Sequence, residues 1–310
     1  MARIFMGEVN FMNYFGATKI LVKNNYKIEN YLFEFSLEGS NNIYFSWIKS
    51  RHDCDYLIST EKKDNFYMNS TLTGLCRELT SLKQTDLLNT SKVNYFYVNN
   101  MHTTFANCFS LKESPISPRI VQSMYGTYYN CTNLIGQAAS NRIVNNMIGT
   151  YYNCTNITGT PICNDNVMFM KGTYYNCYQM TGQPIVGPNV ISIEDCYYNC
   201  GGLQGSPADC NNVIIAINAY YNCQNLYGAF NWYEVNFNIA SRINATNMFY
   251  GRNYSNELCI YVRDNSSVMN ALLNYSHKYG NIYGVGTIDW TQSGDYYYNS
   301  LYNTKIYIQE

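Results

Sequence analysis

Cysteine is the residue whose type and spacing first suggest chemistry. The chain has 310 residues, of which 12 are cysteines. Six of them recur at a constant 23-residue spacing, namely Cys108, Cys131, Cys154, Cys177, Cys200 and Cys223. A column of thiols can form disulfides, bind a metal ion or fill a core as small apolar groups.

Core thiols are the interpretation that the rest of the sequence favours. Neighbouring rungs of a stack lie about 5 Å apart, which suits linked Cα atoms, but parallel side-chain directions disfavour a disulfide. Cys-x-x-Cys spacing does not occur, and the three histidines (His52, His102 and His277) are far apart in the sequence. A zinc site would therefore need several distant segments to converge. We expect neither a metal ion nor another cofactor.

Acidic residues offer little for catalysis. Between Met101 and Phe230 they are Glu113, Asp165, Glu194, Asp195 and Asp209. Glycoside cleavage needs two carboxylates about 5 to 10 Å apart, whereas adjacent side chains such as the Glu194–Asp195 pair diverge on a helix. A phosphate-binding glycine loop is not visible either. We expect the protein not to be an enzyme.

The residues around these cysteines define a 23-residue repeat. An asparagine directly precedes each cysteine, as Asn107, Asn130, Asn153, Asn176, Asn199 and Asn222. An aromatic residue stands three positions before each, as Phe105, Tyr128, Tyr151, Tyr174, Tyr197 and Tyr220. Valine occurs ten positions before the cysteine, mostly methionine seven before, and Leu, Ile or Met three after. A period held in so many columns predicts stacked repeats.

The spacing inside one unit predicts its local structure. The apolar positions are separated by three, four and three residues, which is the pattern of one helix face. A glycine follows most of the cysteines by five residues, and often a proline follows by seven; both favour a bend and an extended return. We therefore expect an α/β repeat solenoid of short helical turns and short parallel strands, because such units bury their apolar faces only by stacking.

Three segments follow from this pattern. The repeats are expected over residues 51–255, with clear units over 98–230 and degenerate units at both ends. Cys76 keeps the Cys-x-x-Leu spacing and precedes Cys108 by a 32-residue step, which implies an inserted segment. Residues 248–252 resemble one more unit without its cysteine. The segments 1–50 and 256–310 are expected to be β-rich.

Both flanking segments contain strand-like patterns. Residues 31–37 and 42–47 alternate polar and apolar side chains and predict a β-hairpin. Near the C-terminus, residues 258–262 and 296–308 are strand-like, and residues 267–275 are periodically apolar. These flanks either cap the open core of the stack or attach it to a larger assembly.

The composition excludes several classes of protein. A hydrophobic content of 46% with a net charge of −1 is not that of a disordered chain. Because 20 Lys+Arg are balanced by 21 Asp+Glu, we expect no nucleic-acid partner. Apolar runs are far shorter than a membrane-spanning helix requires, so no membrane span is expected, and residues 1–30 show no secretory leader.

Tyrosine is the residue with the clearest functional promise, with 33 in the chain. Two consecutive residues of a turn cannot both face the core, so the second tyrosine of each pair is expected to point outward. This stripe comprises Tyr129, Tyr152, Tyr175, Tyr198 and Tyr221. It is a candidate partner-binding surface, since tyrosine combines apolar area with a hydroxyl; the alternative is stacking that only stabilises the repeats.

For the asparagine column we favour a structural role, either hydrogen bonds to the backbone at the turn or stacking of amide on amide.

The unit from Met147 to Pro161 resembles the BspA-like leucine-rich repeat, whose 23-residue unit has an Ile-Gly pair, a buried aromatic residue, a cysteine and a leucine three residues later. The resemblance covers residues 50–255. It departs from the family in its Tyr-Tyr-Asn segment and in the Gly and Pro columns, which are closer to variants in phage and AT-rich bacterial proteins. The resemblance implies a solenoid used for adhesion or interaction, without catalytic residues.

Taken together, these features predict a non-enzymatic structural or recognition protein of a virion, specifically a bacteriophage tail, baseplate or fibre component for assembly or host attachment. Its expected location is the virion, assembled in the host cytoplasm within an oligomeric assembly. Its expected partners are other virion or surface proteins, a host receptor or a glycan. The alternative is an adhesin at the bacterial cell surface that binds host protein or glycan; an intracellular scaffold is a third hypothesis.

Overall fold

The computed structural model describes residues 98–233, 243–264, 266–273, 281–284 and 288–309, with shorter pieces before residue 98. These residues belong to two compact units, described separately below. The first comprises residues 1–144 and 149–157, and the second comprises residues 145–148 and 158–310. The predicted segment limits at residues 50 and 255 stay predictions.

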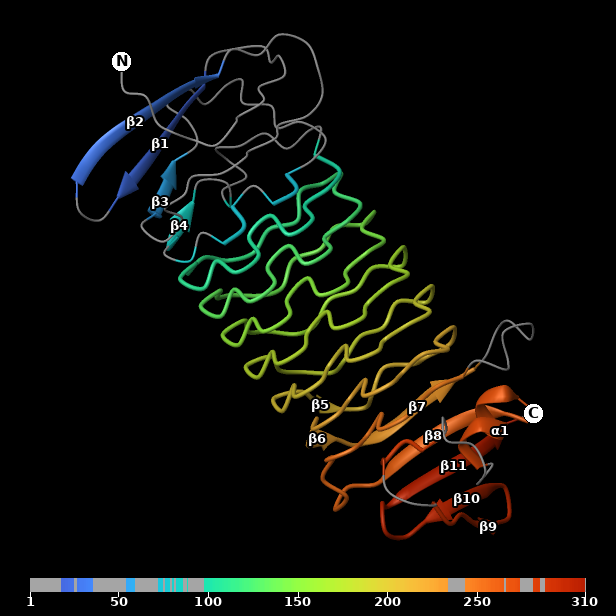
Figure 1. The fold of residues 1–310 in the computed structure, drawn as a ribbon. Helices are drawn as coiled ribbons and strands as arrows, with labels where there is room; N and C mark the ends of the chain where they lie inside the picture. Colours follow the sequence, from blue (N-terminus) through green and yellow to red (C-terminus); the bar gives the residue numbers. More distant parts are fainter. Residues whose placement is uncertain are drawn as a thin grey trace. The chain divides into compact units, whose positions relative to one another are not determined.

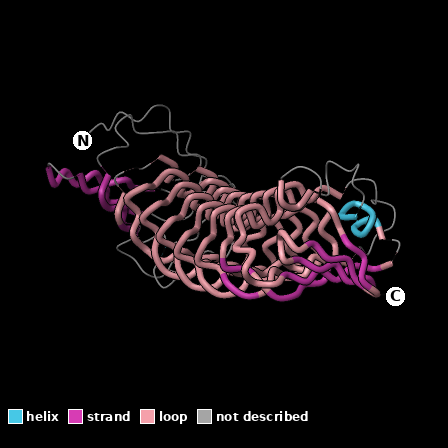
Figure 2. The backbone as a smooth tube through the Cα atoms, turned by 90° about the horizontal axis from the view of Figure 1, so that it is seen from below, coloured by secondary structure: helices cyan, strands magenta, loops and turns pink. Residues whose placement is uncertain are grey.

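The regular secondary structure of the described residues is mostly β and includes a single α-helix, α1 (Ser267–Leu273). The strands of the first unit are β1 (Thr18–Asn24), β2 (Lys27–Phe35), β3 (Cys54–Ile58) and β4 (Gln84–Thr85). Those of the second are β5 (Gln204–Gly205), β6 (Asn225–Leu226), β7 (Gly228–Trp232), β8 (Leu258–Arg263), β9 (Thr291–Ser293), β10 (Tyr296–Asn299) and β11 (Thr304–Gln309). In each unit, successive coils of loops and turns lie side by side (Figures 1 and 2).

The N-terminal strands form a four-stranded sheet in the order β2-β1-β3-β4 (Figure 1). β1 pairs antiparallel with both β2 and β3, and β3 pairs parallel with β4. β2 covers much of the predicted strand at residues 31–37. Its predicted hairpin partner at residues 42–47 lies outside the described residues.

The C-terminal strands form a five-stranded sheet in the order β7-β8-β11-β10-β9. β7, β8 and β11 are parallel, whereas β10 and β9 continue antiparallel. Leu258, Ile260 and Val262 of β8 are fully buried, as the alternation in this strand requires. The periodically apolar segment becomes α1, whose first turn is capped by the Ser266 hydroxyl accepting from the N–H of Met269 at 3.0 Å.

The predicted apolar columns of the repeat form the core of each unit. The valine, methionine, aromatic, cysteine and leucine positions are all buried, most with no exposed surface, including Val190, Ile193, Tyr197, Cys200 and Leu203 of one coil. Short parallel bridges join successive coils in the extended part, for example Gly182 with Leu203 and β5 with β6. The core of the repeat is therefore built from the predicted residues.

The predicted helical half is not found: the described residues 98–230 contain no helix, and the segments before each cysteine are successive turns. Two positions per coil explain why. The asparagine before the cysteine has φ of 56–63° throughout, and the position four residues earlier is also left-handed, as in Gly126 (φ 56°) and Asp195 (φ 54°). An α-helix requires φ near −63° at every residue, so two left-handed residues interrupt it.

Left-handed residues allow the backbone to hydrogen-bond alternately within and between coils. Backbone N–H groups at positions 101, 103, 105 and 107 donate to carbonyls of the next coil, at positions 123, 125, 127 and 129, over 2.7–3.0 Å. Those at positions 104, 106 and 108 donate to carbonyls three residues earlier in their own coil. Each turn is thus satisfied locally and also joined to its neighbour, which fixes the register of the stack.

The register differs from the predicted one at the N-terminal end of the stack. Backbone hydrogen bonds pair residues 72–78 with residues 100–106, so Cys76 takes the aromatic position equivalent to Phe105 rather than the cysteine position. Between these coils the chain therefore makes a 29-residue step, from Cys76 to Phe105, in place of the predicted 32-residue step.

The C-terminal end of the stack shows the same step. There, residues 245–252 form the expected additional coil, and Arg252 stands where the cysteine would be, a 29-residue step beyond Cys223. Arg252 is buried, and its guanidinium donates to the backbone carbonyls of Asn256 and Tyr302 at 2.6 and 2.7 Å.

Substitutions at Asn199 separate its backbone role from its side-chain role. Asn199→Gly keeps the left-handed backbone but removes two side-chain hydrogen bonds, and we expect a loss of about 1–2 kcal/mol in the free energy of unfolding. Asn199→Ala should lose about 1 kcal/mol more, because a Cβ disfavours this backbone conformation. Urea unfolding of both variants measures the difference, and equal losses would show that the left-handed conformation is not maintained.

Candidate functional site

Each Tyr-Tyr pair of the repeat contributes one ring to the core and one to the surface. The first tyrosine of each pair is fully buried, whereas the second is partly exposed. Because this division recurs in successive coils, the rings form two separate columns in each unit. The partly exposed column is the candidate functional site.

The buried aromatic column is held by ring stacking and by hydroxyl bonds. In the second unit, Tyr174, Tyr197, Tyr220 and Phe249 stack with centroids 5.5 Å apart. The Tyr197 hydroxyl donates to the carbonyl of Ile185 at 2.5 Å and accepts from the N–H of the same residue at 3.2 Å. Tyr128, Tyr151 and Tyr174 make the same pair of contacts with a residue 12 positions earlier, and the Tyr220 hydroxyl accepts from the N–H of Ala208 at 3.3 Å. This column is therefore structural.

The partly exposed column is packed more closely. In the second unit, centroid separations are 4.5 Å for Tyr175–Tyr198, 4.4 Å for Tyr198–Tyr221 and 4.7 Å for Tyr221–Tyr250. In the first unit, Tyr129 and Tyr152 stack at 4.6 Å. The predicted stripe is thus present in each unit. Tyr250, with 38% of its surface exposed, was missed as a member, although the Phe249–Tyr250 pair repeats the pattern.

The stacking decides what this column offers to a partner. The rings of Tyr198 and Tyr221 are nearly parallel, at 7°, and each has a neighbour on both faces. Their faces are therefore covered, and only ring edges and hydroxyls meet solvent. A sugar ring cannot stack on these inner rings, so recognition here depends on hydrogen bonds and edge contacts.

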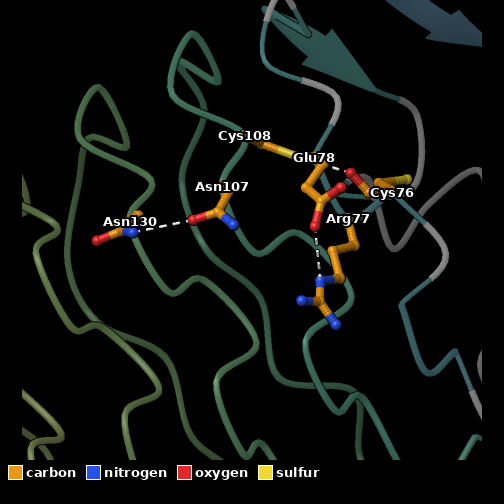
Figure 3. Close-up of polar contacts among 6 residues, drawn as sticks. All are labelled: Cys76, Arg77, Glu78, Asn107, Cys108 and Asn130. Atoms are coloured by element: carbon orange, nitrogen blue, oxygen red, sulfur yellow. Dashed lines mark hydrogen bonds and ion pairs between the residues drawn. The ribbon is translucent and has the colours of Figure 1, made fainter. Parts of the chain in front are cut away.

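A row of asparagine amides accompanies the tyrosines. Each amide donates to the side-chain oxygen of the asparagine one coil earlier, at 2.9 Å for both Asn199→Asn176 and Asn222→Asn199. In the first unit the row runs from Asn153 through Asn130 to Asn107, and Figure 3 shows the bond between Asn130 and Asn107. Glu78 takes the next position with φ 65°, and forms an ion pair with Arg77. The amide-on-amide arrangement considered for this column is what the side chains form.

A second polar row lies four residues before the asparagines. Asn218 donates to the carboxylate of Asp195 at 2.9 Å, and Asn247 donates to Asn218 at 3.0 Å. Sequence reasoning missed this column. Its position is occupied at 23-residue spacing by Gly126, Gly149, Gly172, Asp195 and Asn218, and this pattern could have revealed it. Glycine, aspartate and asparagine share tolerance of the left-handed conformation.

The electrostatics of the site are mild. Partial burial raises the pKa of the Asp195 carboxyl, while the bond from Asn218 lowers it. Partial burial also raises the pKa of Tyr198, with further contributions from Tyr175 and Asp195. Glu194 pairs with Lys171 at 3.0 Å. The adjacent acids Glu194 and Asp195 therefore serve an ion pair and a hydrogen-bonded row.

Thiols and threonine hydroxyls complete the contacts between coils. The Cys131, Cys154, Cys200 and Cys223 thiols each donate to the carbonyl of the aromatic residue one coil earlier, at 2.9–3.0 Å. Cys108 donates to the carbonyl of Cys76 (Figure 3). Thr104, Thr127 and Thr150 form a fully buried column in the first unit that sequence reasoning missed, and Thr173 is fully buried in the second; these hydroxyls donate to methionine or leucine carbonyls.

The described cysteines, from Cys76 to Cys259, are thiols and form no disulfides. Burial raises the pKa of the core thiols, for example that of Cys200 to about 12. Across the described ranges, His, Cys, Asp and Glu side chains do not gather in groups of three that could hold a metal ion. None of the described chain forms a helix long and apolar enough to cross a lipid bilayer.

Comparison of the chain with protein-family models, with curated proteins and with solved structures found no match. The site is therefore interpreted from its own geometry.

Proposed function

We propose that this protein is a non-enzymatic recognition protein, a leucine-rich-repeat-like solenoid that binds another macromolecule through its partly exposed tyrosine column. The column Tyr175–Tyr198–Tyr221–Tyr250 carries this proposal. Tyrosine is enriched at interfaces because it combines a large ring with a hydroxyl and loses little conformational entropy on binding. The buried aromatic column already supplies the core, so the second column is not needed to fill it.

The setting that we propose is a virion, with the protein as a tail, baseplate or fibre component of a bacteriophage. Support comes from the sequence, in which the repeats resemble those of BspA-like proteins and the cysteines are arranged for a core. The groups that the column offers to a partner are ring edges, hydroxyls and amides. A protein surface or the hydroxyl groups of a glycan satisfies these groups, whereas stacking of sugar rings on Tyr198 or Tyr221 does not.

Mass spectrometry of purified particles, with matched variants, tests this proposal. The double variant Tyr198→Ser, Tyr221→Ser should fold but be lost from particles or from attachment to host cells. Tyr227→Ser is the control, because Tyr227 is 48% exposed and lies outside the column; it should behave as the wild type. Urea unfolding of each variant confirms that folding is retained.

Two outcomes contradict the proposal. Equal incorporation and attachment of the double variant would remove the tyrosine column from the binding surface. Absence of the wild-type chain from particles, together with its presence on a bacterial envelope, would replace the virion setting by that of a cell-surface adhesin.

A further inference from the structure

We propose that the partly exposed tyrosine column is a site of oxidative cross-linking, at which a one-electron oxidant joins neighbouring rings as dityrosine. Centroids at 4.4–4.7 Å with interplanar angles of 7–17° hold the rings of Tyr175, Tyr198, Tyr221 and Tyr250 in near-parallel pairs. Reacting groups held at contact distance need no diffusional encounter, which greatly favours their coupling over competing reactions. This inference does not depend on the proposed recognition function.

The chemistry is a two-electron oxidation of a tyrosine pair. Each phenol loses one electron to the oxidant and its hydroxyl proton to water, giving two adjacent phenoxyl radicals. A carbon–carbon bond then forms between the ring carbons next to the hydroxyls. The hydrogens on those two carbons move to the oxygens through solvent, which restores both phenols. The net change is loss of two hydrogen atoms, as two electrons and two protons, for one new bond.

The same molecule contains a tyrosine column that should not react. Tyr174, Tyr197 and Tyr220 are fully buried, lie 5.5 Å apart, and direct their hydroxyls to backbone groups. Oxidants in water reach the outer column and not this one. The selectivity between adjacent residues such as Tyr197 and Tyr198 is therefore a direct consequence of the fold.

The thiols of the core do not compete effectively for the oxidant. Cys200 and Cys223 are fully buried and donate to backbone carbonyls at 2.9 Å. Oxidation of cysteine proceeds through an accessible thiolate, and burial raises the pKa of both thiols and keeps them protonated. A dityrosine between Tyr198 and Tyr221 would instead join two successive coils, the constraint on the unfolded chain that a disulfide usually provides.

Photo-oxidation with a ruthenium–bipyridyl complex and persulfate tests the inference on the full chain at high dilution. Asp209 lies between Tyr198 and Tyr221, so a protease that cleaves at aspartate leaves the two tyrosines in separate peptides unless they are linked. We expect the peptides that contain Tyr198 and Tyr221 to be covalently joined, two hydrogen atoms lighter than their sum, with the blue fluorescence of dityrosine and a raised thermal midpoint.

Phenylalanine variants identify the linked rings, since phenylalanine stacks but cannot form a phenoxyl radical. Tyr221→Phe should abolish the joined peptide pair, whereas Tyr220→Phe, its neighbour in the buried column, should leave the yield within about twofold of the wild type. A wild-type chain that gives no joined pair while free tyrosine in the same solution dimerises would overturn the inference. A link between the Tyr198 and Tyr221 peptides that survives in Tyr221→Phe, or that disappears in Tyr220→Phe with the fold retained, would overturn it as well.

Discussion

Replacing Tyr197 with alanine is expected to lower the free energy of unfolding by about 4 kcal/mol or more, while the same replacement at Tyr198 lowers it by about 1–3 kcal/mol. Tyr197 is fully buried between Tyr174 and Tyr220, so its removal loses the burial of a large ring and leaves a cavity in the stack. The backbone N–H and carbonyl of Ile185 also lose their hydroxyl partner, which adds about 1–3 kcal/mol if water cannot replace it.

Tyr198 supplies the matched control, because it is the same residue type one position away. Its ring is partly exposed, and truncation removes mainly its stacking with two neighbours, each worth about 0.5–1.5 kcal/mol. Tyr197→Phe isolates the hydroxyl and should lose about 1–2 kcal/mol. Urea unfolding of the three variants gives the comparison. Similar losses for Tyr197→Ala and Tyr198→Ala would contradict the assignment of one column to the core.

Alkaline pH is expected to destabilise the protein strongly, by about 5 kcal/mol between pH 8 and pH 10. The fully buried thiols Cys131, Cys196, Cys200 and Cys223 have pKa values raised by burial above the ordinary 9.0. Unfolded thiols lose their protons above pH 9, whereas the folded protein retains them. Unfolding then releases protons, so each such thiol removes about 1.4 kcal/mol per pH unit between its two pKa values.

The buried phenols also lower the free energy of unfolding as the pH rises. Burial raises the pKa of Tyr197 and Tyr220 well above 10, so their contribution is complete below pH 10 and is lost above it. Urea unfolding from pH 7 to 10.5, in the presence of a phosphine reductant, measures the slope. Cys200→Ala should reduce the number of protons released on unfolding at pH 10 by about one. Stability that stays constant up to pH 10 would show that the thiols are not shielded from water.

The sequence was sufficient to predict the core columns and the outward tyrosines, but not the local conformation. Spacings of three, four and three residues occur on a helix face, and they also place side chains inward along a run of turns that contains two left-handed residues. Asparagine before the cysteine was visible in every unit, and it tolerates the left-handed conformation, but its backbone N–H is bonded to the next coil, a partner that the pattern of one unit does not reveal. Periodicity identifies which residues are buried, while the backbone that buries them depends on the neighbouring coil.

The end coils show a second limit of sequence reasoning. Cys76 matches the Cys-x-x-Leu spacing, but it takes the aromatic position once the coils are paired through their backbone. Arg252 gives no hint in the sequence that it replaces a cysteine, because a charged side chain is rarely buried. Its guanidinium is accommodated by backbone carbonyls that belong to a loop and to the segment before β11. Such tertiary partners cannot be recognised from a repeat pattern.

The 29-residue steps at both ends of the stack determine how this chain can change in length. Six extra residues at each end leave the backbone pairs in register, and at the C-terminal end the stacked rings as well, since the additional residues lie outside the segment that carries these contacts. An insertion of a single residue between the methionine and the cysteine of a unit would instead shift the stacked rings, the asparagine row and the backbone hydrogen bonds of that unit together. Variation in this architecture is therefore expected as duplication or deletion of whole units, or as changes in the outer bends, so that the chain can lengthen its partly exposed tyrosine column one ring at a time.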